Sequence, residues 1–121
     1  MHSYRDLIVW QKAFALSKEV YHLTASFPDT EKYGLSSQLR RAAVSIVSNI
    51  AEGFSRKSLK ENYQFFSVAF GSTSEVETQL LLSRELQLVE PDKFRKAEGL
   101  LLEVRKMLNS MLGKSRRIAK S

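Results

Sequence analysis

Apolar residues recur at every third or fourth position through four long segments, which is the spacing of helices that bury one face. We therefore predict helices over residues 4–25, 36–53, 59–87 and 91–113, the fourth either ending after Gly113 or continuing its periodicity to Ile118. No segment combines alternating apolar and polar residues with turn signals, so no sheet is predicted. Long helices joined by short loops indicate an all-α fold, an antiparallel up-down-up-down four-helix bundle, with residues 1–121 as a single domain.

In the first, second and fourth predicted helices the apolar residues form a stripe along one side, and this stripe predicts which side faces the core. The first helix should bury Leu7, Trp10, Phe14, Ser17, Tyr21 and Thr24, with Ala13 and Val20 beside them. The second should bury Leu35, Leu39, Ala43, Ile46 and Ile50. The fourth has the alternating spacing of a coiled-coil seam and should bury Phe94, Ala97, Leu101, Val104, Leu108 and Met111.

The third predicted helix differs because it is apolar on two sides. One stripe consists of Leu59, Tyr63, Phe66, Phe70 and Leu80. A second stripe consists of Phe65, Val68, Val76 and Leu86. A helix that is apolar on two sides must bury both of them, and in a small chain the second partner is expected to be another subunit.

Local signals mark helix ends and one crossing. Ser58 and Glu61 form a capping box at the start of the third helix, each satisfying a free backbone amide. Gly53 is expected to end the second helix. Gly71 and Ser72 lie inside the third helix, where glycine costs about 1 kcal/mol relative to alanine. A close helix crossing is the first explanation of Gly71, and a ligand-contact groove is the second.

The charge is unevenly distributed. The chain has 19 Lys and Arg against 13 Asp and Glu, a net charge of +6. Residues 1–104 are balanced, and the whole excess lies in residues 105–121, including a basic C-terminal tail predicted at 114–121. Such a tail is typical of contact with phosphates or acidic surfaces. It equally suits a solvated end whose cations face the negative end of a helix dipole.

The candidate nucleic-acid-binding residues are therefore the basic positions before the third helix and near the C-terminus. They are Arg56, Lys57, Lys60, Arg105, Lys106, Lys114, Arg116, Arg117 and Lys120. No aromatic platform or groove-reading motif accompanies them, so sequence-specific readout is not expected.

Several chemistries have no support in the sequence. The chain has no Cys, and neither His2 nor His22 has a second ligand at metal-binding spacing. Phosphate-binding glycine loops and nucleophile motifs are absent from the sequence. We expect no enzyme, no cofactor, no metal and no small-molecule substrate. No apolar run is long enough to cross a membrane and no signal peptide is recognisable, so a cytoplasmic protein is expected.

One polar group within the helices needs a structural explanation. Its members are Arg41, Asn49, Glu52, Glu75 and Gln79. An arginine–carboxylate network between helices, which sets their register or a subunit contact, explains this group better than a catalytic carboxylate does.

The run from Arg41 to Gly53 reads RAAVSIVSNIAEG. Further elements of the same pattern are Val9-Trp10-Gln11-Lys12-Ala13, Tyr33-Gly34-Leu35, Gln38, Arg56-Lys57-Ser58, Glu61, Gly71-Ser72, Glu75 and Gln79. With them, nearly the whole chain resembles the 23S rRNA intervening-sequence protein family, known as four helix bundle proteins. One departure is Val47, where many members have a proline, so the second helix is expected to be straighter.

The resemblance implies a four-helix bundle that assembles as a ring-like homopentamer. Related accessory proteins of diversity-generating retroelements bind RNA and a reverse transcriptase. The residues Arg41, Asn49, Glu52, Gly53, Glu61, Gly71 and Glu75 are interpreted as a fold and assembly motif.

Two functions follow as hypotheses. The first is a non-catalytic oligomer that binds structured RNA or another nucleic acid through basic surfaces. The alternative is a structural scaffold or accessory protein that binds a protein partner, such as a reverse transcriptase, with no nucleic-acid contact of its own.

Overall fold

The computed structural model describes residues 3–120, with side chains described as far as Lys114. Four long helices make up the fold: α1 (Ile8–Thr24), α2 (Leu35–Ser55), α3 (Leu59–Glu85) and α4 (Arg95–Lys120). Three short 3-10 turns accompany them: η1 (Tyr4–Asp6), η2 (Asp29–Glu31) and η3 (Pro91–Phe94). Residues 3–120 contain no strand.

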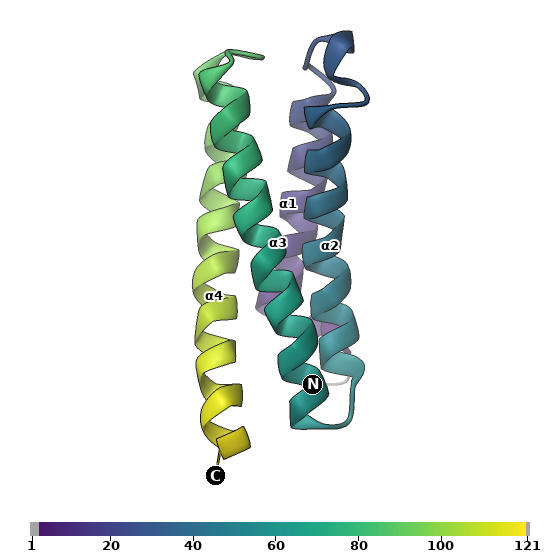
Figure 1. Cartoon of the computed structure of the whole chain (residues 1–121), viewed down its shortest axis with the longest axis vertical. Coiled ribbons are helices and arrows are strands. Elements are labelled where there is room, and N and C mark those ends of the chain that lie inside the picture. The colour runs from purple at the N-terminus through teal and green to yellow at the C-terminus, as the bar shows by residue number, and fades with distance from the viewer. Residues whose placement is uncertain (1–2, 121) are drawn as a thin grey trace.

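The helices run alternately up and down and form an antiparallel four-helix bundle (Figure 1). Each helix packs against its neighbours in the chain, and α4 closes the bundle against α1. As a result, α1 and α3 lie on a diagonal. The predicted fold class is confirmed, and α2 passes Val47 without a break.

The core stripes of α2 and α4 are confirmed because their spacing leaves only one apolar face. Leu39, Ala43, Ile46 and Ile50 are buried on α2, with Leu35 packed partly against them. On α4 the buried residues are Phe94 in the preceding turn, Ala97, Leu101, Val104 and Leu108, with Met111 partly buried.

The predicted core face of α1 is confirmed in part: Ser17 and Thr24 are buried, and Leu7 and Trp10 pack partly against the core, but Phe14 and Tyr21 do not lie in it. The buried residues are Val9, Ala13, Leu16, Ser17, Val20, Leu23 and Thr24. Phe14 and Tyr21 instead remain 46% and 47% exposed. The aliphatic side chains fill the core, while the larger aromatic rings lie at the edge, where Trp10 stacks on Phe14 and Arg40 covers Tyr21.

The two stripes predicted for α3 are also corrected. Val76, assigned to the second stripe, lies in the core with Phe66 and Leu80. Leu59, assigned to the first stripe, is exposed. The inner face also contains small polar residues, and the Ser83 hydroxyl donates to the backbone carbonyl of Gln79 at 2.7 Å, so its polar group is satisfied inside the helix.

The helix ends differ from the sequence expectations at two places. α4 continues to Lys120, so the predicted tail at 114–121 is helical as far as that residue. The buried Leu112 anchors these last turns to the bundle. α2 continues through Gly53 to Ser55, so Gly53 does not end the helix.

Gly53 has a packing role that the sequence did not reveal. A Cβ added there would lie 2.6 Å from Cε1 of Phe66, so α2 and α3 approach each other closely at this residue. The close crossing predicted at Gly71 is wrong, because a Cβ there would meet nothing within 4 Å.

Candidate nucleic-acid interface

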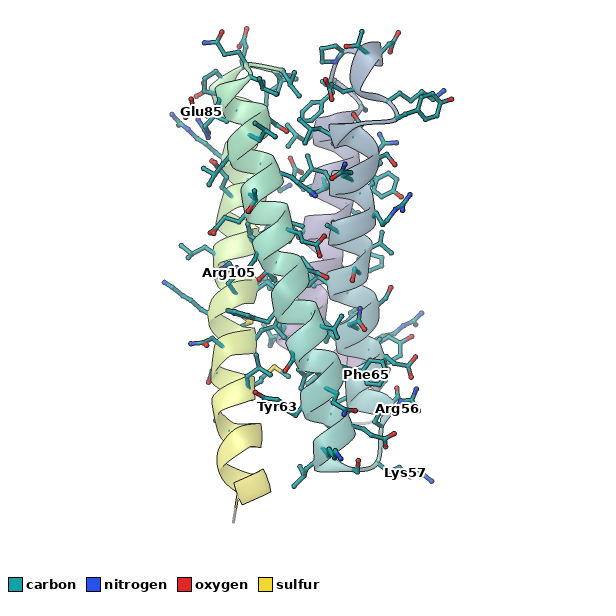
Figure 2. All side chains as sticks on the ribbon, viewed as in Figure 1. Arg56, Lys57, Tyr63, Phe65, Glu85 and Arg105 are labelled. Atoms are coloured by element: carbon teal, nitrogen blue, oxygen red, sulfur yellow. The ribbon has the colours of Figure 1, made fainter. Side chains whose placement is uncertain are left out.

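The turn between α2 and α3 holds three cations, Arg56, Lys57 and Lys60, which we call the basic corner. Residues 53–60 contain no acidic side chain. Because α3 and α4 are antiparallel, the C-terminal half of α4 lies beside the N-terminal half of α3, where Tyr63 and Ser67 face Asn109 and Leu112. The basic corner and the C-terminal end of α4 therefore occupy the same end of the bundle (Figures 1 and 2).

The backbone of the basic corner is held by local hydrogen bonds. The Glu61 amide donates to the Ser58 hydroxyl at 3.1 Å, which confirms half of the capping box. The other half differs, since the Glu61 carboxylate accepts from the Ser58 hydroxyl at 3.2 Å. The Asn62 side chain donates to the carbonyl oxygens of Gly53 and Arg56 and joins the end of α2 to the start of α3.

Arg56 is partly engaged within the chain. Its guanidinium forms an ion pair with the Glu52 carboxylate at 3.1 Å, one helical turn earlier. It also lies over the ring of Phe65 at 4.9 Å from the ring centroid. Figure 2 shows Arg56 and Phe65 side by side near this end of the bundle. These contacts orient Arg56 and partly neutralise it.

Four predicted cations are exposed: Lys57, Lys60, Lys106 and Lys114. None of them forms an ion pair with another described side chain. These lysines are therefore available to a negatively charged ligand. The side chains of Arg116, Arg117 and Lys120 lie outside the described residues, although the α4 backbone extends to Lys120.

Arg105 is in a different environment from the one predicted. Its guanidinium donates to the Thr73 and Ser74 hydroxyls at 2.9 and 3.0 Å. It also lies 4.8 Å from the Phe70 ring centroid and 4.0 Å from a carboxylate oxygen of Glu77. Figure 2 shows Arg105 between α3 and α4 in the middle of the bundle. Arg105 therefore joins two helices and does not belong with the candidate phosphate contacts.

The opposite end of the bundle has charges of both signs. Its turns carry Asp29, Glu31 and Asp92 together with Lys32 and Lys93. Glu85, at the end of α3, lies there too (Figure 2). The two ends therefore differ in charge, and only the end with the basic corner has an uninterrupted positive turn.

The predicted arginine–carboxylate network does not form among the described residues of one chain. Glu52 pairs with Arg56, and the Asn49 amide donates to the backbone carbonyl of Ser45 at 2.8 Å. Arg41 and Glu75 instead line a groove between α2 and α3, with no ion pair between them. Gln79 lines the same groove, and Tyr33 and Ser37 complete its edge.

Two further features of the described residues concern other kinds of site. Within residues 3–114, no three His, Asp or Glu side chains come together as they would around a metal ion. No described helix is long and apolar enough to cross a membrane.

The fold and the surface together define the class of protein: it is an antiparallel four-helix bundle with one basic end. Residues 5–110 match the family model of the 23S rRNA-intervening sequence protein. The chain belongs to this family, which confirms the resemblance. A crystal structure of a Bacteroides thetaiotaomicron protein of unknown function, from the S23 ribosomal protein family, is similar in fold, with a TM-score of 0.80 and 20% identity over 87% of this chain and 98% of that chain. No curated protein matches the sequence.

Proposed function

We propose that this protein is a non-catalytic, oligomeric four-helix bundle protein of the cytoplasm that binds structured RNA or another nucleic acid through its basic end. The observation that carries the proposal is that the basic corner and the C-terminal end of α4 lie at the same end of the bundle. These two segments are about fifty residues apart in the chain, and the antiparallel bundle brings them to one end.

The available side chains suit phosphate contacts. Lys57, Lys60 and Lys114 are exposed and have no described ion pair. Lysines of this kind displace condensed counterions from a nucleic-acid backbone without reading bases. The proposed ligand is therefore recognised by charge and shape, as in structured RNA, more than by sequence.

Assembly strengthens the same surface. The proposed state is a homopentameric ring, which the family resemblance implies and the exposed apolar residues of α3 support. Five basic ends on one assembly would multiply the local positive potential and the number of phosphates contacted.

The test is a binding titration with structured RNA and duplex DNA at several salt concentrations. Log affinity should fall with log salt, by about 0.9 per contacted phosphate on duplex DNA and about 0.7 on single strands. The double variant Lys57→Glu/Lys60→Glu should lose about tenfold or more in affinity, because it makes the charge of the interface more negative by four units. Wild-type affinity no better than that of an inert protein of equal charge would contradict the proposal.

A matched control uses the other end of the bundle. Lys32→Glu/Lys93→Glu makes the same change in net charge at positions near η2 and η3. This control should leave most of the affinity intact. An equal loss in both double variants would mean that only net charge matters and that the basic end is not the binding surface.

The C-terminal end can be tested separately by ending the chain after Gly113. This removes Lys114, Arg116, Arg117 and Lys120 and leaves the buried Leu112 in place. Affinity should fall and the salt dependence should become shallower, while the thermal transition should stay nearly unchanged.

A second candidate function is a scaffold or accessory protein for a protein partner, such as a reverse transcriptase. It is supported by an apolar groove between α3 and α4, where Leu81 and Leu102 are exposed and Glu77 and Glu98 lie at the edge. A pull-down with and without nuclease separates the two functions. A partner retained after nuclease treatment would favour the scaffold.

A further inference from the structure

The groove between α2 and α3 is lined mainly by polar residues, and not all of their polar groups have a partner among the described residues. It has a volume of about 550 Å³ and is lined by Ser37, Gln38, Arg41, Ser45, Glu75 and Gln79. We call it the α2–α3 groove. It lies away from the basic corner, further along both helices, and the proposed nucleic-acid contacts do not use it.

The polar groups of the α2–α3 groove are incompletely paired. Arg41 and Glu75 are exposed and carry opposite charges, and neither forms an ion pair with a described side chain. The Oε1 atom of Gln79 is buried and accepts no hydrogen bond from the described residues, while its Nε2 donates to Gln38 at 3.3 Å. A buried acceptor without a donor is destabilising, so the single chain leaves this region incomplete.

Exposed apolar residues continue the same face of α3. Val68 and Leu82 each lie seven residues from Glu75, which places all three on one side of the helix. Their side chains are 52% and 47% exposed. An apolar, acidic, apolar stripe beside a groove is the surface expected of a helix-docking site.

The chain has a second face that is complementary to this one. On α1, Phe14, Lys18 and Tyr21 are exposed and follow the 4,3 spacing of a single helical face. This stripe is apolar, basic, apolar, and Lys18 forms no ion pair among the described side chains. α1 lies diagonally across the bundle from α3, behind it in Figure 1, so one chain cannot join the two faces.

We infer that the α2–α3 groove is an interface that receives the outer face of α1 from a second copy of this chain. Lys18 of the incoming copy pairs with Glu75, its two aromatic rings cover Val68 and Leu82, and Arg41 stacks on an aromatic ring. A contact between two unlike faces generates a closed ring or a filament. The inference rests on the proposed assembly of several copies and assigns its interface.

Charge exchange tests the inference, with mass measured by light scattering over a dilution series. Lys18→Glu and Glu75→Lys should each raise the dissociation constant of the assembly at least about thirtyfold, because like charges then meet at the contact. The double variant Lys18→Glu/Glu75→Lys should recover to within about tenfold of wild type. Glu85→Lys, the same change near the far end of α3, is the matched control and should assemble like wild type.

A second measurement leaves these charges untouched. The chain has no cysteine, so Val68→Cys carries a single thiol on the proposed interface. When the protein concentration is raised until the chains assemble, the reaction of this thiol with a thiol reagent should slow at least about tenfold. Ser110→Cys, exposed on α4, should react at the same rate throughout. Circular dichroism checks that each variant is folded.

The failures are distinguishable. Suppose that the wild type assembles, that neither single charge reversal lowers the measured mass, and that the Val68→Cys thiol stays reactive. This result would overturn the proposed interface and leave the proposed assembly standing. A wild type that is monomeric at micromolar concentration would overturn both. Protection of the Val68→Cys thiol only after RNA is added would assign the groove to nucleic acid and overturn the inference.

Discussion

Arg105 on α4 and the lysines of the basic corner look alike in the sequence, yet the bundle places them in opposite surroundings. Arg105 contacts two hydroxyls, an aromatic ring and a carboxylate of α3, and its side chain is only 25% exposed. Lys57 and Lys60 are exposed and have no described ion pair. The first region uses a positive charge to join helices, and the second presents positive charge to solvent.

The difference shows how a bundle assigns roles to its cations. A guanidinium has five donors in a planar fork, so it can bond several groups between two helices at once. A lysine at a helix start has few neighbours to bond and keeps its ammonium in water. The comparison predicts that changes at Arg105 affect stability and that changes at the corner lysines affect binding.

The largest expected effect on stability is at Arg105. Arg105→Ala should lower the free energy of unfolding by about 2–3 kcal/mol, because the variant cannot form these hydrogen bonds to a charged group and leaves the buried Thr73 hydroxyl without its donor. Urea denaturation followed by circular dichroism measures it. Nucleic-acid affinity of the folded variant should change little. A stable variant with weakened binding would reverse the comparison.

A change of about 2 kcal/mol is expected where the basic corner is anchored to the core. Gly53→Ala places a methyl group against the buried ring of Phe66, and overpacking of this kind costs about 1–3 kcal/mol. Gly71→Ala is the matched control, since its added methyl group meets open space and helix propensity favours alanine. Thermal unfolding of the two variants should shift in opposite directions.

A smaller decrease in stability is expected at the cap of α3. Ser58→Ala removes the acceptor for the Glu61 amide and should cost about 1 kcal/mol. Ser58→Asp keeps an acceptor at this position and should restore most of the stability. If Ser58→Ala unfolds at the same urea concentration as wild type, the cap does not hold the corner in solution.

The smallest effect on stability is expected for the corner lysines themselves. Lys57→Ala/Lys60→Ala should change the free energy of unfolding by less than about 0.5 kcal/mol, as for other exposed positions. The same variant should reduce the slope of log affinity against log salt by about 0.7–0.9 for each phosphate that the protein no longer neutralises. An unchanged slope would show that these lysines do not bind phosphates.

Features that depend on neighbouring residues in the chain were predicted well. The stripes of α2 and α4 each leave one apolar face, and the Ser58 cap forms within four residues, so local spacing was sufficient. The stripe of α1 was ambiguous, because aromatic residues and aliphatic residues each form a helical stripe. Only packing against α2 and α4 decided that the aliphatic stripe faces inward.

Features that depend on distant residues could not be predicted in the same way. The close crossing at Gly53 requires Phe66 on the next helix, and the role of Arg105 requires hydroxyls about thirty residues away. The Arg41 and Glu75 side chains share a groove without pairing, which the residue types alone did not indicate.

By itself, the sequence determined four helices, a balanced body and an excess of positive charge near the C-terminus, because periodicity and charge are properties of the chain. The tertiary structure decided which cations remain available. Antiparallel packing placed the basic corner and the end of α4 at the same end of the bundle, and the packing of α4 on α3 engaged Arg105 with the hydroxyls of Thr73 and Ser74. The physical reason is that a side chain's hydrogen-bond partners are set by which helices meet, and these partners come from remote parts of the chain.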